Sequence, residues 1–219
     1  MTRYVIVPIV EGHGEVQAVP ILIQRWLQHR RFHLNFSLDV KGPVRASGKG
    51  ALKVAHNADD ELGIEHYIEY ALLRRPDGII VILDADDDAP ASLGPVLLHR
   101  ARASVPSDLP ICVVLAVREF EAWFLSAFPS PVFRANLEAS GYVLSRRTLP
   151  RGTDVETIAN CKAYVARLIG IPKYEPTTHQ PALTGILPFT QAMCRRSPSF
   201  ARLLTELDSL MQRVRRHRS

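Results

Sequence analysis

One run of apolar residues limits, more than any other feature, what this chain can fold into. Residues 79–83 read Ile-Ile-Val-Ile-Leu, with the turn-forming pair Asp77-Gly78 before them and the acidic stretch 84–88 after them. Branched apolar residues without polar alternation are typical of a β-strand that is covered on both faces, as in a parallel sheet. The sequence therefore predicts a buried strand that ends in a cluster of carboxylates.

Three further segments are expected to join this strand in one sheet. Residues 4–10 and 111–116 are nearly continuous apolar runs, and residues 36–40 alternate between apolar and polar side chains. The segments between them are expected to be helical, at about 15–30, 51–74 and 91–103. Alternating strands and helices with right-handed crossovers predict an α/β fold whose largely parallel sheet is flanked by helices.

The pattern changes after residue 128. Prolines punctuate the rest of the chain, and helices are expected at about 154–169 and 199–213, with a loop through Pro188 between them. We therefore expect two parts, a catalytic core at residues 1–128 and a C-terminal helical appendage at residues 129–219 that packs on the core.

Composition narrows the class of protein. Hydrophobic residues make up 47% of the chain and charged residues 22%, as in globular proteins with a substantial core. No apolar stretch reaches the ~20 residues that span a bilayer, so we expect a cytoplasmic protein without membrane contact. The three cysteines have neither disulfide-framework nor zinc-site spacing. A net charge of +5 is compatible with a nucleic-acid partner.

Acidic residues follow three of the four predicted strands. Glu11 comes directly after the first strand, Asp84 after the third, and Glu119 and Glu121 after the fourth. In an open parallel sheet such positions meet in the crevice beyond the carboxyl ends of the strands. Because neighbouring carboxylates repel one another unless a cation lies between them, and oxygen ligands favour Mg²⁺ or Mn²⁺, the sequence predicts a divalent-metal site at this edge.

The loop after the first strand has two glutamates four residues apart. Gly12 and Gly14 lie between Glu11 and Glu15, so Glu15 can begin a helix and point back toward Glu11. The glycines also allow a phosphate to approach backbone N–H groups at the helix N-terminus. The alternative is that Glu15 only stabilises the helix dipole from the first turn.

The acidic cluster after the third strand is the second candidate. Asp84 and Asp86 can both reach a metal pair if the chain turns after the strand, and Asp88 is a further candidate ligand. A calcium loop is excluded, because Ala89 and Pro95 stand where such a loop requires glycine and glutamate. The alternative interpretation is a group of solvated loop acids.

Glu119 and Glu121 are the third candidate pair. If both were helical, they would lie about 200° apart around the helix axis and could not easily serve one metal ion. Glu119 is nearer the strand end and is preferred as the ligand, with Glu121 second. Trp123 and Phe124 are expected in the core.

These motifs resemble those of a known superfamily. The Glu11 to Glu15 loop and the Asp84-x-Asp86 motif resemble the signature motifs of the Toprim domain, which topoisomerases, bacterial primases and overcoming-lysogenization-defect nucleases share. The segment 118–123, with Lys173-Tyr174 downstream, is similar to a bacterial Toprim-like family of unknown function. Members of that family are often encoded beside ABC-type or AAA ATPases.

The resemblance implies a metal-dependent nuclease. Glu11 would be the metal-proximal acid or general base, Asp84 and Asp86 would hold Mg²⁺ or Mn²⁺, and Lys173 would complete the catalytic set. Hydrolysis of DNA or RNA is preferred, because the chain has neither a visible tyrosine-bearing domain for a topoisomerase nor a zinc module for a primase. A role in phage defence with an ATPase partner is implied by the resemblance alone.

Further residues and two other functions stay open. Basic residues that can hold phosphate are Lys41, Arg45, Lys49, Lys53 and Lys173. A phosphomonoesterase of the haloacid-dehalogenase kind would also use an Asp-x-Asp motif, but there the motif follows the first strand. The other alternative is a non-catalytic or regulatory subunit of an ATPase complex.

Overall fold

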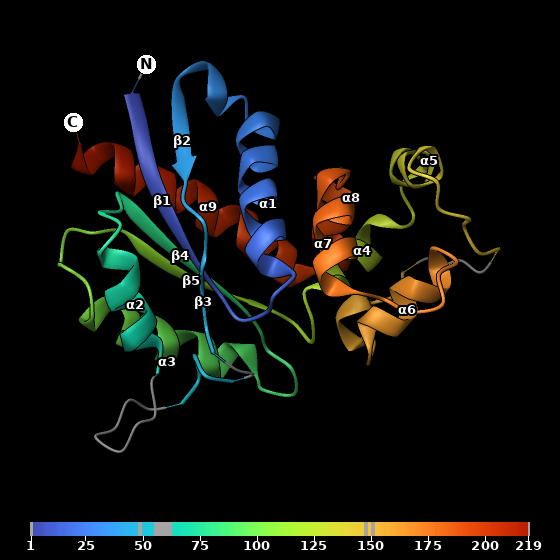
Figure 1. Ribbon diagram of the computed structural model, residues 1–219, viewed down its shortest axis with the longest axis horizontal. Helices are drawn as coiled ribbons and strands as arrows, with labels where there is room; N and C mark the ends of the chain where they lie inside the picture. The colour runs from blue at the N-terminus through green and yellow to red at the C-terminus, as the bar shows by residue number, and fades with distance from the viewer. Residues whose placement is uncertain (1, 48–49, 55–62, 147–148, 150–151, 219) are drawn as a thin grey trace.

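The centre of the molecule is a parallel sheet. A computed structural model describes residues 2–47, 50–54, 63–146, 149 and 152–218. In this part of the chain the sheet has five strands in the order β2-β1-β4-β5, with β3 beside the end of β1 and every pair parallel. Their bounds are Thr2–Val10 (β1), Phe36–Val40 (β2), Val44–Arg45 (β3), Gly78–Asp84 (β4) and Ile111–Ala116 (β5). Helices lie on both faces, which confirms the predicted α/β fold (Figure 1).

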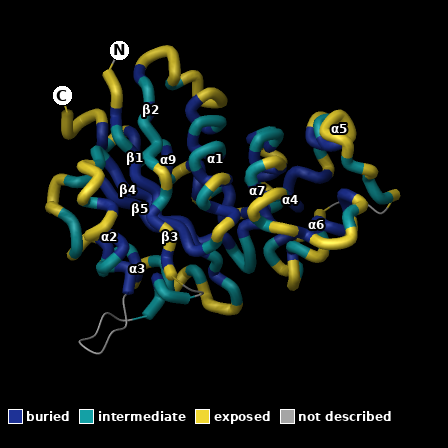
Figure 2. The backbone as a smooth tube through the Cα atoms, in the orientation of Figure 1, coloured by how far each residue is buried: buried dark blue, intermediate teal, exposed yellow. Residues whose placement is uncertain are grey.

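Both faces of the sheet are covered. Ile80 and Ile82 of β4 belong to the hydrophobic core shared with α1 (Glu15–His29) and α9 (Pro198–His217). The alternate residues of β4 belong to a second core with α2 (Ile64–Leu72) and α3 (Pro90–Ala103). Because successive side chains of a strand point to opposite faces, a strand covered on both must be apolar throughout. The central strands are accordingly buried along most of their length (Figure 2).

Pro8 lies in the middle of β1 without breaking it. β2 pairs with β1 as far as Ile6, and β3 pairs with it only from Ile9 onward. The missing N–H of Pro8 therefore falls in the gap between these two neighbours, where no ladder hydrogen bond is lost. The short strand β3, which the sequence pattern did not predict, continues the sheet edge beyond this gap.

The helices after β5 differ in part from the prediction. The helix expected at 154–169 is divided into the short 3₁₀ helix η2 (Val155–Thr157) and α6 (Cys161–Leu168), because Asn160 takes a left-handed conformation and caps α6. The prediction of a loop before Pro188 was wrong, because residues 176–185 form helix α7 (Pro176–Gly185). Pro176 lies in the first turn of this helix, where proline is tolerated. The remaining elements are η1 (Phe32–Leu34), α4 (Glu121–Ala127), α5 (Pro131–Ala139) and α8 (Gln191–Arg196).

Two further expectations concern the length of elements and parts. The helix expected at 51–74 begins only at Ile64, residues 51–54 form a turn, and residues 55–62 lie outside the described residues. The division of the chain at residue 128 stays a prediction. Helix α9 returns from the C-terminal part to pack on β4 and β5, so both parts contribute to one core.

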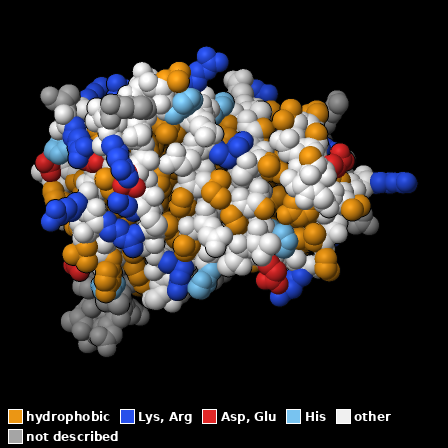
Figure 3. Space-filling view, turned by 45° about the horizontal axis from the view of Figure 1, so that its top comes forward, with side chains coloured by type: hydrophobic (Ala, Val, Ile, Leu, Met, Phe, Trp, Pro, Cys, Tyr) orange, Lys and Arg blue, Asp and Glu red, His pale blue; other side chains and the backbone are white. Residues whose placement is uncertain are grey.

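The basic C-terminus lies far from the carboxyl edge of the sheet. Arg215 stacks over the ring of Phe36, and Arg218 stacks over Tyr4 and pairs with Asp77 at 2.8 Å. Tyr4 and Phe36 lie at the amino ends of strands, and Asp77 directly precedes one. These arginines therefore connect the C-terminal part of α9 to the amino-terminal edge of the sheet. Lys and Arg side chains gather mainly at the left in Figure 3, over the part that holds the sheet. No helix in the described part is long and apolar enough to cross a membrane.

Candidate metal and phosphate site

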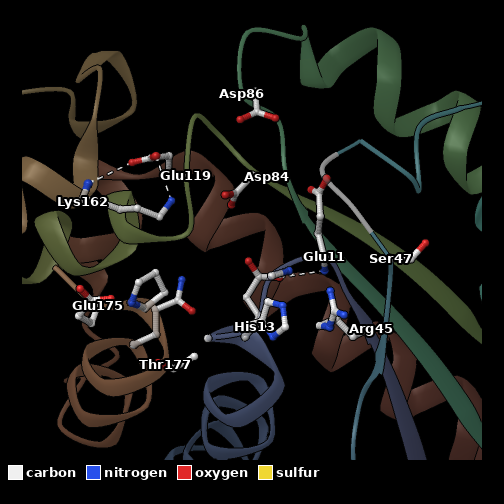
Figure 4. A pocket seen from close by; sticks show the side chains of 15 residues that line it. Glu11, His13, Arg45, Ser47, Asp84, Asp86, Glu119, Lys162, Glu175 and Thr177 are labelled. Atoms are coloured by element: carbon white, nitrogen blue, oxygen red, sulfur yellow. Dashed lines mark hydrogen bonds and ion pairs between the residues drawn. The ribbon is translucent and has the colours of Figure 1, made fainter.

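A cavity of about 670 Å³ opens at the carboxyl ends of the strands. Asp84 lies in the middle of the group, with Glu119 and Lys162 on one side and Glu11 and Arg45 on the other (Figure 4). The acids that line the cavity are Glu11, Glu15, Asp84, Asp86, Glu119 and Glu175. Five of the seven predicted metal ligands thus border one cavity. The other two, Asp88 and Glu121, are not among its lining residues.

The loop from Glu11 to Glu15 is shaped by its own hydrogen bonds. Glu15 begins α1, and its Oε2 atom accepts hydrogen bonds from the backbone N–H groups of Glu11 and Gly12, at 3.1 and 3.2 Å. Gly14 is required for a close approach, because a Cβ atom there would lie 2.0 Å from Oε1 of Gln180 on α7. The side chain of Glu15 is therefore turned back toward Glu11, as the spacing predicted.

Three acids, which we call the inner acids, have raised pKa values: Glu15 and Glu121 are buried, and Asp84 is half-buried at the end of β4. Burial raises the pKa of Glu15 to about 7, helped by repulsion from Glu121 and Glu11 and opposed by its two backbone hydrogen bonds. Burial, followed by repulsion from Glu15 and Glu121, raises the pKa of Asp84 well above its usual value. Desolvation penalises the charged form, and like charges add to the penalty. This site disfavours its own ionised carboxylates in the absence of a cation.

Among the described residues, Lys162 on α6 is the cation that pairs with one of the inner acids. Its Nζ atom lies 3.0 Å from Oε1 of Glu119, with which it hydrogen bonds, and 3.3 Å from Oε2 of Glu121. Burial alone would lower the pKa of Lys162, but the attraction of Glu121, Asp84 and Glu119 outweighs burial and raises it. Lys162 is therefore charged, and it neutralises part of the acid cluster.

Glu119 and Glu121 do not share the geometry assumed in the sequence argument. Helix α4 begins at Glu121, so Glu119 lies in the turn before it and the helical angle between them does not apply. Glu119 lines the cavity, whereas Glu121 is fully buried beneath it and accepts a hydrogen bond from Nε2 of Gln180 at 2.8 Å. Trp123 and Phe124 are core residues, as expected.

Three acids in the loop after β4, which we call the outer acids, are Asp86, Asp87 and Asp88. Lys53 Nζ lies 3.1 Å from Asp86 and 2.9 Å from Asp88, while Asp87 pairs with Arg118. Burial lowers the pKa of Lys53, but its hydrogen bonds to Asp88 and Asp86 outweigh this and raise it. The outer acids are thus held by cations of the chain itself.

The backbone beside the outer acids is strained. Asp86 and Arg118 form an isolated antiparallel bridge, and both have positive φ angles, of 54° and 65°. Such conformations are uncommon in residues other than glycine and concentrate at functional sites. The bridge also holds the loop after β4 against the turn that carries Glu119.

The donor chemistry of the cavity suits a hard divalent cation. The described residues hold no group of three acidic, histidine or cysteine side chains close enough to bind a metal ion as they stand. One oxygen of each of Glu11, Glu15 and Asp84 accepts a hydrogen bond from a backbone N–H, whereas the other accepts none from the described residues. Three partly free carboxylates can therefore supply ligands, provided that their side chains rotate toward one another.

The predicted phosphate-binding residues are dispersed. Arg45 lines the cavity, Lys53 holds the outer acids, and Lys41 pairs with Asp39. Lys49 lies outside the described residues. Lys173, predicted as catalytic, does not line this cavity, and its side chain is 80% exposed and pairs with Glu175 at 2.7 Å.

The amino-acid sequence was compared with known families. Residues 10–208 match the family described as Domain of unknown function (DUF4276). The chain belongs to this family. The DUF4276 match includes every residue that lines the 670 Å³ cavity at the carboxyl ends of the strands, which we call the acid cavity. No curated protein and no solved structure matches the chain.

Two residues of this DUF4276 site escaped the sequence argument. Lys162 contacts Glu119 across 43 positions of sequence, and Gln180 contacts Glu121 across 59. Lys162 lies on α6, the second part of the segment that was predicted as one helix at 154–169, and Gln180 lies on α7, which the pattern did not predict. The one usable signal was Asn160, a helix-capping residue type just before Lys162, which marks the start of α6.

Proposed function

We propose that this protein is a metal-dependent phosphodiesterase that hydrolyses nucleic acid. The observation that carries the proposal is the convergence of Glu11, Glu15 and Asp84 in one cavity at the carboxyl ends of parallel strands, next to the cations Arg45 and Lys162. Acids with raised pKa values in a cleft, here Glu15 and Asp84, are typical of functional sites, and a divalent cation relieves the repulsion between carboxylates.

The proposed ligands are the cavity carboxylates. Glu11, Glu15 and Asp84 would hold Mg²⁺ or Mn²⁺ through their free oxygens, and Asp86 joins them from the outer side, where Lys53 now pairs with it. The chemistry that such a cation supplies is activation of a water molecule and stabilisation of charge on the leaving oxygen. A Toprim relationship, which the loop and the Asp84-x-Asp86 motif suggest, is part of this proposal.

Two cations of the chain are available to the substrate. Lys162 borders the cavity from α6 and Arg45 from β3, so they flank the acids on opposite sides (Figure 4). We assign to Lys162 the phosphate-neutralising role that the sequence argument gave to Lys173. A phosphodiester held between these cations would approach the acids without the repulsion that it would meet on its own.

The test is cleavage of plasmid, single-stranded DNA and tRNA in Mg²⁺, Mn²⁺ or EDTA. We expect cation-dependent cleavage by the wild type and a loss of about a hundredfold or more in Asp84→Asn, since even partners of metal ligands contribute about 10–100-fold. Asparagine retains an oxygen that can accept the Phe120 N–H hydrogen bond, made at 2.7 Å to Asp84 Oδ1, so folding should be preserved.

The matched control is Asp87→Asn. It removes the same charge from the same loop, but the Asp87 side chain is 95% exposed and pairs with Arg118 outside the cavity. Both variants are purified in the same way, so cleavage by a contaminating nuclease would be the same in both preparations. Equal cleavage by Asp84→Asn and Asp87→Asn, or cleavage that persists in EDTA, would contradict the proposal.

A further inference from the structure

A second cavity adjoins the acid cavity, and it has the opposite charge. Its volume is about 550 Å³, and α6 and the segment that leads into α7 line it. Lys162, Arg167 and Lys173 border it, and its described lining contains no aspartate or glutamate. Lys162 lines both cavities, so one lysine is common to a lining that contains acids and a lining whose charged residues are all basic.

Arg167 is the clearest feature of this second cavity. Its guanidinium carbon lies 4.9 Å from the centre of the Tyr164 ring, one helical turn earlier on α6. Among the described residues no carboxylate pairs with it. Stacking on an aromatic face holds the planar guanidinium without using its N–H donors. Arg167 is therefore an oriented cation whose donors are available to an anion.

The rest of the lining also suits an anionic ligand. Oδ1 of Asn160 caps α6 by accepting from the N–H of Ala163, which leaves the amide NH₂ group as a donor beside the cavity. Lys173 adds a second exposed cation, shared with Glu175, which lines the acid cavity. Ile171 and Pro172 supply apolar surface against which a sugar can pack.

We propose that the second cavity is a phosphate subsite, which binds the backbone phosphate next to the phosphodiester in the acid cavity. This inference rests on the proposed function and names its substrate as a polynucleotide strand. Successive phosphates of a strand are joined through a single sugar, so a lysine common to two cavities can contact both. The ion pairs of Arg167 and Lys173 with the strand would then add to affinity and not to the chemical step.

The experiment separates binding from cleavage. Binding of a short fluorescein-labelled single-stranded oligonucleotide, in DNA and RNA forms, is measured by anisotropy in EDTA at several salt concentrations. For Arg167→Gln we expect about tenfold weaker binding and a salt slope lower by about 1, because one phosphate contact is lost. Cleavage of bis(p-nitrophenyl) phosphate, which has a single phosphate, should be the same as in wild type.

Arg195→Gln is the matched control. Arg195 is also an exposed helical arginine, on α8, and it lines neither cavity. Its substitution removes the same charge and should leave oligonucleotide binding within about twofold of wild type, as expected for a charge distant from the bound strand. Inorganic phosphate and a mononucleotide, added as competitors, should displace the oligonucleotide only at far higher concentration.

Each result has a defined meaning. Equal weakening by Arg167→Gln and Arg195→Gln would overturn the subsite, because it would reflect net charge alone. Competition by inorganic phosphate as effective as that by unlabelled oligonucleotide would also overturn it, in favour of a small-anion site. Weaker binding by Arg167→Gln in a protein that cleaves nothing would support the subsite and contradict the proposed hydrolysis.

Discussion

The inner and outer acids lie at the same edge of the sheet but have opposite surroundings. Glu15 and Glu121 are buried and Asp84 is half-buried, and the pKa values of all three are raised. Lys162 pairs with Glu121 at 3.3 Å. The outer acids Asp86, Asp87 and Asp88 reach solvent and each pair with Lys53 or Arg118. These six acids therefore do not form one uniform site.

The comparison shows that pairing and burial, and not the number of carboxylates, decide where ionised carboxylates are destabilised. An exposed ion pair contributes little to stability, and removing it has little effect. A buried carboxylate that repels its neighbours destabilises the charged state of the site, so a bound cation has a large effect there. The following three predictions test this difference, in order of the expected effect.

The largest effect on stability is expected for Glu15→Gln in EDTA. Because the folded pKa of Glu15 is about 7 and lies above its usual 4.5, the folded protein binds this proton more tightly. Wild-type stability should therefore fall as the pH rises from about 4.5 to 7, and the variant should lack this loss. At pH 8 the variant should be more stable by roughly 3 kcal/mol. Urea unfolding at pH 4.5 and pH 8 measures it.

The sign of the pH dependence is the decisive part of this test. Glutamine keeps an oxygen that can accept from the N–H groups of Glu11 and Gly12, so the loop geometry should persist. The two proteins should differ by only about 0.4 kcal/mol at pH 4.5, where Glu15 is protonated in the folded state and half protonated in the unfolded state. A stability difference of the same size at both pH values would show that the pKa of Glu15 is not raised in the folded state.

A smaller effect is expected for Lys162→Met. The substitution leaves Glu119 and the buried Glu121 without this cation, so at pH 8 the metal-free protein should lose about 2 kcal/mol. That figure is below the usual value for breaking a buried pair, because the Lys162 side chain is 34% exposed. The loss should be smaller at pH 5, since the raised pKa of Glu121 lets it take up a proton. Urea unfolding at both pH values measures it.

Adding Glu121→Gln to Lys162→Met is the control. If the loss comes from an uncompensated buried carboxylate, the double variant should recover most of it at pH 8. No recovery would mean that Lys162 stabilises the protein through packing of its side chain.

The smallest effect is expected for Asp88→Asn among the outer acids. The Asp88 side chain is 51% exposed, and Lys53 keeps its contact with Asp86 when Asp88 changes. The free energy of unfolding should change by less than about 1 kcal/mol. The rise in melting temperature on addition of Mn²⁺ should equal that of wild type. Loss of the Mn²⁺-induced rise in melting temperature would show that Asp88 takes part in binding the cation. The proposed difference between the inner and outer acids would then be wrong.

Much of the fold was visible in the sequence because its signals are local. The apolar run 79–83 and its acidic boundary predicted β4 and its end, and the spacing of Val19, Leu22 and Trp26 predicted α1. The start of α6 was predicted too early, and α7 was not predicted. Proline in the first turn of α7 resembles a loop signal, and tertiary packing against α1 at Gly14 supports that helix.

The sequence by itself determined that acids would collect at the carboxyl edge of a parallel sheet. Apolar runs define the strands, and parallel strands end at one edge. Asp84 is the last residue of β4, and Glu11 and Glu119 follow the ends of β1 and β5. Only the tertiary structure decided how these acids are paired. Lys162 reaches Glu119 from a distant helix, and Lys53 reaches Asp86 from a turn. Periodicity reports the surroundings of neighbouring residues, whereas an ion pair across 43 positions depends on how whole elements pack.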